Sequence, residues 1–286
     1  MQVFLNGRYI DHAAAAVSID DRGFLFADGV YEVMRLYDGR PFLAEPHMRR
    51  LATGLAALRI ADPGIDLEAV AARLIEKNGV SGDGTIYIQI TRGAAPRKHA
   101  FPPPEVRPTV YVIVKPFTLY PDEYMRDGVS AVTVSDTRWS RCDIKSVSLL
   151  PNVLANQHAQ EAGAFEALFV RDGIVLEGSH SNLFAVLDGT LITYPSSNYI
   201  LTGITRNLVL ELAAELGIRV AEAPLPWERL FDVSELFLSG TTTEIMPVTR
   251  VDGRAIGAGR RGNITERLQR AFQERVQAEQ HAAVGA

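Results

Sequence analysis

One lysine and one glutamate stand at places where a folded chain commonly builds a reactive site. Lys145 lies in the stretch CDIKS, between a predicted strand and a predicted helix, and it is one of only four lysines in the 286-residue sequence. Glu177 ends the apolar run GIVLE, where a buried carboxylate would need a partner. A surface lysine and an exposed loop acid are the simpler interpretations, so neither residue is decisive by itself.

Two short segments rich in small residues could hold an anion. Leu201–Asn207, LTGITRN, opens a predicted helix, whose free N–H groups and positive dipole end favour a negative charge. Leu238–Glu244, LSGTTTE, is a turn after a strand and offers further N–H and hydroxyl donors. An ordinary helix cap and a tight turn are the alternatives. With the lysine and the carboxylate, the two segments meet the requirements of pyridoxal phosphate: a Schiff-base lysine, a partner for the ring nitrogen and a phosphate cup.

The elements that position these residues follow from the spacing of apolar side chains. Residues 85–93 and 109–117 are predicted strands, and residues 45–60 and 66–77 show the spacing of helices. The stretch 118–124 contains a proline and little periodicity, so it is the predicted interdomain linker.

We therefore expect two domains of an α+β protein. A small N-terminal α/β domain would span residues 1–117, and a larger C-terminal domain, residues 125–286, would carry Lys145. The larger domain is predicted to contain a strand at 129–137, a meander of strands at 166–194, and helices at 150–164, 203–217 and 264–280.

Composition limits the class of protein. The net charge of -5 argues against a nucleic-acid binder, which would carry a basic excess. A single cysteine, Cys142, fits a reducing compartment, no apolar run approaches the length of a membrane span, and the N-terminus lacks the pattern of a signal peptide. The 6 histidines are scattered without metal-ligand spacing, so no metal site is expected. The expectation is a cytoplasmic protein without a membrane or nucleic-acid partner.

Several motifs give the sequence a resemblance that spans nearly the whole chain. They are, in order, DGVYEV, HMRRL, PRKHAF, RCDIKS, EGSHSN, LTGITR and ELFLSGTTTEIMPV. In these motifs the chain resembles the fold-type IV pyridoxal-phosphate transaminases, and among them most closely the D-amino acid transaminases. The resemblance implies a small α/β domain and a larger, β-rich pseudo-barrel domain. It also implies a homodimer whose active sites lie near the subunit interface.

The resemblance assigns a role to each matching residue. Lys145 would bind the cofactor covalently and act as the base of the proton shift, and Glu177 would face the pyridine nitrogen. Leu201 would pack on the face of the ring. The phosphate would be bound by the side chain or backbone donors of Arg50, Ile204, Thr205, Gly240 and Thr241.

The subfamily expectation rests on the stretch PRKHAF. In D-amino acid transaminases an arginine and a histidine two residues apart, with a tyrosine, bind the α-carboxylate of the substrate, and Arg97, His99 and Tyr31 match these three. Residues i and i+2 of an extended segment point the same way, and a guanidinium offers a planar pair of donors. In the family this pair reaches across from the other subunit. The alternative is a loop arginine and a capping histidine.

We therefore expect a ping-pong transfer of the amino group from a D-amino acid, such as D-alanine, to a 2-oxo acid, such as 2-oxoglutarate. His180 and Gly240 stand where D-amino acid transaminases carry serine. The glycine keeps its N–H, whereas the histidine leaves the substrate preference open.

Other activities share the fold and the cofactor. A branched-chain L-amino acid transaminase, an aminodeoxychorismate lyase and an (R)-amine transaminase are alternatives, although the pair of Arg97 and His99 argues against all three. From another class, the chain could be a catalytically dead binding protein. The presence of Lys145, Glu177 and Arg50 argues against that interpretation.

Overall fold

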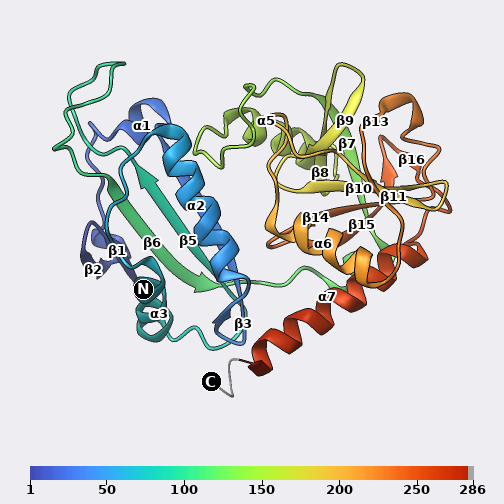
Figure 1. The fold of residues 1–286 in the computed structure, drawn as a ribbon, viewed down its shortest axis with the longest axis horizontal. Helices are drawn as coiled ribbons and strands as arrows, with labels where there is room; N and C mark the ends of the chain where they lie inside the picture. The colour runs from blue at the N-terminus through green and yellow to red at the C-terminus, as the bar shows by residue number, and fades with distance from the viewer. Residues whose placement is uncertain (283–286) are drawn as a thin grey trace. The chain divides into compact units, whose positions relative to one another are not determined.

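The computed structural model describes residues 1–282, and the last four residues lie outside the described chain. The described residues form two compact units (Figure 1). The first comprises Met1–Leu119 together with the short segment Ile144–Ser148. The second comprises Tyr120–Asp143 and the chain from Leu149 onward. Each unit has a sheet of its own.

The first unit is built on a six-stranded antiparallel sheet. Its strands are β1 (Gln2–Leu5), β2 (Arg8–Asp11), β3 (Gly29–Tyr37), β4 (Arg40–Pro41), β5 (Gly84–Thr91) and β6 (Thr109–Pro116). They pair in the order β2-β1-β6-β5-β3-β4. Two-residue turns at Asn6–Gly7 and Asp38–Gly39 join β1 to β2 and β3 to β4, and all four turn residues have positive φ, as expected from the sequence.

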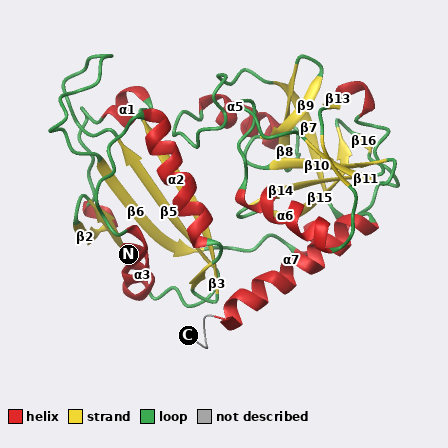
Figure 2. Ribbon diagram, in the orientation of Figure 1, coloured by secondary structure: helices red, strands yellow, loops and turns green. Residues whose placement is uncertain are grey.

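Two helices cover one face of this sheet, as Figure 2 shows for α2 (Ala44–Leu58). The other is α3 (Leu67–Asn78), which begins at the Asp66 cap and ends at Gly79. Leucines from both helices pack with apolar residues of the strands to form one core. Each such side chain, once buried, contributes about 1.5–3 kcal/mol to folding.

A short helix and an irregular segment complete the first unit. Helix α1 (Arg22–Phe26) begins at Asp21, whose carboxylate accepts the N–H of Gly23 and the hydroxyl of Thr91. A 3-10 turn, η1 (His12–Ala14), follows β2. Residues 95–108 contain neither helix nor strand.

The second unit contains a sheet that closes on itself. The strands of the closed ring are β7 (Val129–Ser135), β8 (Glu166–Arg171), β9 (Ile174–Gly178), β10 (Asn182–Leu187), β14 (Glu235–Gly240) and β15 (Glu244–Val251). They pair in the order β9-β8-β7-β15-β14-β10, and β10 pairs back with β9 where Asn182 meets Glu177. This barrel, with apolar side chains such as Leu168, Leu238 and Met246 inside it, confirms the pseudo-barrel expected from the resemblance.

Short strands and helices surround the barrel (Figure 1). The additional strands are β11 (Thr190–Thr193), β12 (Val220–Glu222), β13 (Leu225–Pro226) and β16 (Arg254–Ala255). The helices are α5 (Leu150–Glu161), α6 (Ile204–Glu215), α7 (Asn263–Ala282) and the 3-10 turn η2 (Trp227–Arg229). Within residues 1–282, no helix has both the length and the apolar character that crossing a bilayer would require.

The structure differs from the predicted domain organisation at two places. The predicted linker is partly helical, because α4 (Asp122–Asp127) begins directly after Pro121 with two acids in its first turn. The segment that carries Lys145, expected in the larger domain, packs with the first unit, because Ile144 joins the first core and the backbone bonds to β3. The limits at residues 117 and 125 otherwise stay a prediction.

Candidate functional site

The backbone on either side of Lys145 holds this residue beside β3. The N–H of Tyr31 donates to the carbonyl of Lys145 at 3.0 Å, and the N–H of Val147 donates to the carbonyl of Gly29 at 3.0 Å. The half-buried amine of Lys145 lies 4.3 Å from the centroid of the Tyr31 ring. The other three lysines are exposed. The structure thus brings together two predicted site residues, Tyr31 and Lys145. Lys145 is also more buried than the other three lysines.

A buried group of charges lies close to Lys145 in the same unit. Glu32, on β3, is fully buried, and its carboxylate accepts from Nε and Nη2 of Arg50 at 2.6 and 2.9 Å. The Nδ1 atom of His47 lies 2.8 Å from the same carboxylate. His47 and Arg50 come from one side of α2, three residues apart. Burial acts to raise the pKa of Glu32, but the bonds from His47 and Arg50 and the charge of Lys145 lower this pKa to about 2.

Glu32 and His47 were not expected from the sequence, although one signal marks Glu32. It shares the inward face of β3 with Val30 and Met34, where an acid interrupts an apolar row. Arg50, predicted to bind a phosphate, gives two of its N–H groups to Glu32. An anion bound at Arg50 would therefore share the guanidinium with a fixed carboxylate.

Replacing Glu32 with glutamine is expected to lower the free energy of unfolding by about 3 kcal/mol at pH 7, because the charge of Arg50 loses its buried partner. The folded-state pKa of Glu32 lies below its ordinary value of 4.5, so its stabilisation is present above pH 4.5 and is lost as the pH falls toward about 2. Urea unfolding across this range should show the difference between variant and wild type shrinking.

The matched control is Glu45→Gln, which removes an exposed acid paired with Arg49 on the same helix. Its effect should stay below about 1 kcal/mol. A loss for Glu32→Gln that is the same at pH 3 and pH 7 would contradict the proposed linkage.

Glu177 in the second unit has three protein donors. It lies at the end of β9 and is only 4% exposed. Its carboxylate accepts from Nη1 of Arg138 at 2.5 Å, from Nδ2 of Asn182 at 2.9 Å and from the N–H of Leu201 at 3.1 Å. Burial raises the pKa of Glu177 to about 7, while Arg138 and the N–H of Leu201 oppose that shift. A carboxylate has about four acceptor positions, so one position is left for a further donor.

Arg138 was not identified from the sequence as a partner of Glu177. It is anchored by Asp136, whose Oδ1 accepts from Nε at 2.9 Å, and its guanidinium lies 4.1 Å from the centroid of the Phe169 ring. No periodic pattern links these positions, because their contact depends on the closed barrel. The arginine supplies a positive charge beside Glu177 that lowers the pKa of this carboxylate against the larger effect of burial.

The start of α6 is an uncapped helix end. Its N-cap residue is Gly203, and no side chain bonds to the first N–H groups. A side chain at Gly203 would not fit, because its Cβ would lie 2.1 Å from Oδ1 of Asn182. Asn182 also donates to the carbonyl of Leu201 at 2.7 Å and pairs with Ser239 across β10 and β14. Asn182 therefore links the start of α6 to the turn that follows β14.

The end of β14 and the turn after it contain buried hydroxyls without a protein partner. Among the described residues, the hydroxyls of Ser239 and Thr243 are buried and make no hydrogen bond. An unpaired buried hydroxyl is unfavourable, so the two atoms point to a missing acceptor. Thr241, the predicted ligand in this turn, is half-buried. Ser239 and Thr243 were missed because a hydroxyl in a turn carries no pattern that shows whether it is satisfied.

These features fit pyridoxal phosphate. Glu177 has an acceptor position for a ring N–H, and the start of α6 with the turn after β14 offers donors for a phosphate. The first unit contains Tyr31, Arg50 and Lys145. The second unit contains the remaining predicted cofactor ligands, which are Glu177, Leu201, Ile204, Thr205, Gly240 and Thr241.

Arg97 and His99 meet one aromatic ring. The guanidinium carbon of Arg97 lies 5.1 Å from the centroid of the Phe26 ring, and the centroid of the His99 ring lies 5.5 Å from it. Both side chains are exposed. The segment is not a strand, so strand alternation does not align the two side chains. They point the same way because both contact the Phe26 ring. Within residues 1–282 no hydrogen bond, ion pair or ring contact joins either side chain to Tyr31 or Lys145.

His180, a departure from the family pattern, contacts a buried acid. Its Nδ1 lies 2.9 Å from Oε2 of Glu166, which is fully buried and also accepts from Ser179 and Ser181. Burial acts to raise the pKa of Glu166, but His180 and the two serines lower it overall. The side chain of His180 is 40% exposed.

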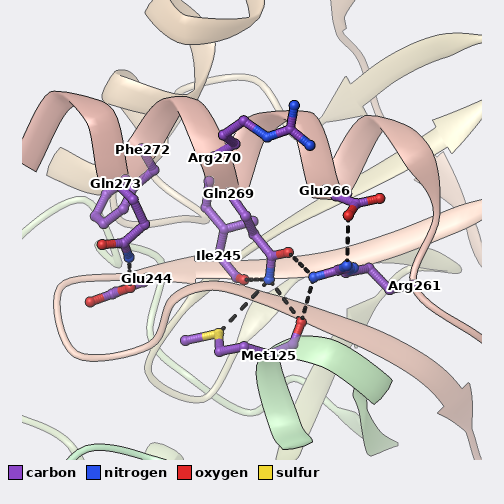
Figure 3. A pocket seen from close by; sticks show the side chains of 9 residues that line it. All are labelled: Met125, Glu244, Ile245, Arg261, Glu266, Gln269, Arg270, Phe272 and Gln273. Carbon is purple, nitrogen blue, oxygen red and sulfur yellow. Dashed lines mark hydrogen bonds and ion pairs between the residues drawn. The ribbon is translucent and has the colours of Figure 1, made fainter. Parts of the chain in front are cut away.

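A separate hollow lies beside α7 (Figure 3). It has a volume of about 290 Å³, and the nearby polar groups are bonded to one another. Gln269 donates to the carbonyls of Ile245 and Met125 at 2.9 and 3.1 Å, and Arg261 pairs with Glu266 at 2.9 Å. None of the predicted site residues lines it. In the described part of the chain no group of three or more acids, histidines or cysteines is placed to hold a metal ion.

Comparison with known proteins gives matches over nearly the full length. Residues 29–251 match the family model described as amino-transferase class IV. A D-alanine aminotransferase of Bacillus licheniformis is 41% identical over 284 residues, covering 98% of each chain. The branched-chain amino acid aminotransferase of Escherichia coli has a TM-score of 0.87 at 30% identity, over 96% of this chain and 93% of that one. The pyridoxal-phosphate-bound form of a hypothetical aminotransferase from Mycobacterium tuberculosis has a TM-score of 0.81 at 26% identity, over 98% and 100%.

Proposed function

The chain belongs to the class IV aminotransferases, and we infer from this membership that it is a pyridoxal-phosphate enzyme that transfers an amino group from a D-amino acid to a 2-oxo acid. The observation that carries the D-specific conclusion is the 41% identity to a D-alanine aminotransferase over 98% of both chains. The stretch PRKHAF supports it, because Arg97 and His99 face one ring and can present their donors together.

A branched-chain L-amino acid activity is the second candidate. It is favoured by the likeness to the Escherichia coli branched-chain enzyme, with a TM-score of 0.87. That likeness concerns the fold, and the identity of 30% is lower than the 41% shared with the D-alanine enzyme. The sequence relationship therefore favours the D-amino acid over the L-amino acid.

Bound pyridoxal phosphate supplies an electron sink, which makes the Cα–H bond of an attached amino acid acidic. We assign to Lys145 the covalent attachment of this group and the movement of the Cα proton. We assign to Glu177 the holding of a proton on the ring nitrogen, through the acceptor position that its three protein donors leave. Arg138 supports this role by favouring the ionised carboxylate.

The phosphate is assigned to donors from several elements. Ile204 and Thr205 supply N–H groups at the uncapped start of α6, and the end of β14 with the turn after it supplies Gly240 and Thr241. Arg50 contributes the positive charge of its guanidinium, which it shares with Glu32. Leu201 packs on the ring face in this proposal.

The substrate carboxylate is assigned to Arg97, His99 and Tyr31. A guanidinium and an imidazole held side by side offer at least three donors to one carboxylate. Fixing this carboxylate sets which face of Cα is turned toward Lys145, so the same contacts that provide affinity also select the hand of the amino acid. A 2-oxo acid presents the same carboxylate and would bind in the same way.

We also propose a homodimer and a cytoplasmic location. Three large apolar side chains on α5 are exposed in the single chain, Leu150 at 69%, Val153 at 58% and Leu154 at 63%. They are spaced at i, i+3 and i+4, so they form one stripe that a partner subunit would bury. The exposed Arg97 and His99 would then serve the partner's site. A free, buried Cys142 agrees with a reducing compartment.

The deciding experiment is a half-reaction followed by cofactor absorbance. The holoenzyme is mixed with D-alanine or with L-alanine, without a 2-oxo acid. The cofactor absorbance should change at least about 100-fold faster with D-alanine than with L-alanine. The reason is that misplacing the reacting Cα–H by about 1 Å costs roughly that factor in rate. A faster reaction with L-alanine or L-leucine would overturn the proposal in favour of the branched-chain activity.

A further inference from the structure

A buried arginine donates hydrogen bonds to the backbone of the irregular segment that carries Arg97 and His99. Arg22, the first residue of α1, is only 4% exposed. Its Nη1 donates to the carbonyl of Lys98 at 2.6 Å and, more weakly, to that of Ala100 at 3.4 Å. Its Nη2 donates to the carbonyl of His99 at 3.4 Å. One guanidinium therefore contacts three consecutive backbone carbonyls of the segment.

The position of Arg22 is itself fixed. Its Nε donates to Asp28 at 2.8 Å. The same carboxylate accepts two bonds from Arg92, at 2.8 and 2.9 Å, and the guanidinium of Arg92 lies 3.7 Å from the centroid of the Phe101 ring. The segment is thus held through its backbone at 98–100, by Arg22, and through the side chain of Phe101, by Arg92. Both arginines bind the carboxylate of Asp28.

The same short helix also orders the side chains. Phe26, one turn after Arg22 on α1, is the ring that both Arg97 and His99 contact, and the guanidinium of Arg22 lies 4.9 Å from it. Helix α1 therefore fixes the segment twice, through backbone carbonyls and through an aromatic ring.

Such support is needed because residues 95–108 have no ladder or helix of their own. Donors that bind a carboxylate with useful strength must be held to within about 0.5 Å and 10–20°. An exposed segment without backbone pairing opens easily. The hydrogen bonds from Arg22 take the place of secondary structure at residues 98–100, next to the side chains of Arg97 and His99.

We propose that Arg22 is a positioning residue for substrate recognition, holding the backbone of residues 98–100 so that Arg97 and His99 present their donors together. This inference rests on the proposed function, which assigns those two residues to the substrate carboxylate. The competing explanation is that Arg22 only balances the charge of Asp28. Lysine would keep that charge but could not span three carbonyls with one ammonium group.

The first test is cleavage of the holoenzyme by trypsin, which needs no activity. The wild type should resist cutting after Arg97 and Lys98, whereas Arg22→Lys and Arg22→Gln should be cut there at least about tenfold faster, because cleavage follows the population of the opened segment. The control is Arg35→Gln, which removes another buried arginine of the same unit, bound to Asp83 and remote from this segment. It should leave cleavage at these two sites unchanged.

The second test is the split between kcat and KM. Both Arg22 variants should raise KM for D-alanine and for a 2-oxo acid by about 10- to 100-fold, with kcat at saturation changed far less and the KM for a primary amine without a carboxylate changed little. Arg35→Gln should leave the ratio of these KM values as in the wild type. If Arg22→Gln does not fold, Arg22→Lys still carries the test.

Wild-type cleavage and KM in Arg22→Lys would overturn the proposal, since charge balance alone would then suffice. Faster cleavage with an unchanged KM, or an equal change in Arg35→Gln, would also overturn it. Failure of the proposed function would look different, because the wild type itself would not turn over D-alanine, whatever the trypsin result.

Discussion

The variant Lys145→Ala is expected to lose transaminase turnover by about 10⁴-fold or more, because both covalent attachment of the cofactor and movement of the Cα proton depend on this amine. The fold should persist, since the contacts that hold the segment use its backbone rather than its side chain. Turnover and the thermal unfolding midpoint, measured on one preparation, check both parts. Borohydride reduction followed by peptide mass analysis locates the attachment in the wild type.

The control is Lys115→Ala, which removes an exposed lysine of β6 and should leave turnover unchanged. The assignment would be wrong if the reduced cofactor were found on Lys77, Lys98 or Lys115. It would also be wrong if Lys145→Ala kept more than a small fraction of the wild-type rate after careful removal of contaminating enzyme.

The second large effect is expected for Arg97→Ala. Removing one partner of a desolvated carboxylate costs about 2–5 kcal/mol, which corresponds to a rise in KM of roughly 30-fold to several thousand-fold for D-alanine. The KM for the 2-oxo acid should rise by a similar factor, because both substrates present the same carboxylate. An (R)-amine without a carboxylate should be affected little. Kinetics with the three substrates provide the measurement, and an equal loss for the amine would show that Arg97 is structural.

Mixing the Lys145→Ala and Arg97→Ala variants, assayed at a D-alanine concentration at which each alone is nearly inactive, tests whether Arg97 serves the other subunit. A hybrid of Lys145→Ala and Arg97→Ala chains would contain one site with both residues intact and one site with neither. Unfolding and refolding the mixture should therefore restore activity. No recovery, with hybrids detected by mass, would place Arg97 in the site of its own chain.

How much could be predicted from the sequence depended on whether a feature is local. The hairpin at Asn6–Gly7 and the core helices follow from turn chemistry and apolar spacing, and the structure has them. The partner of Glu177 could not be found in this way, because Arg138 meets it only after the barrel has closed. Likewise, the alternation of side chains along β3 places Glu32 on the same face as the apolar Val30 and Met34. That alternation identifies an unusual acid, but it does not identify the helix residues that neutralise its charge.

The placement of Lys145 shows the same limit. As predicted, Lys145 lies between a strand and a helix. The segment around it, however, contributes to the core of the first unit. A five-residue segment has too few apolar side chains to reveal which core it will join. The pairing of Val30 with Ser146 and the burial of Ile144 in the first core both tie the segment to that unit.

The seam of the barrel has a consequence for how the chain matures. The ring closes where Asn182 meets Glu177, and these two residues also bind the segment before α6. In a chain whose β9 and β10 are not yet paired, Glu177 and the start of α6 are not held together by Asn182, so the cofactor site proposed above would be incomplete. A ligand that binds only the closed state stabilises that state by mass action. If pyridoxal phosphate binds at Glu177 and at the start of α6 as proposed, it would stabilise the pairing of β9 with β10 that closes the barrel.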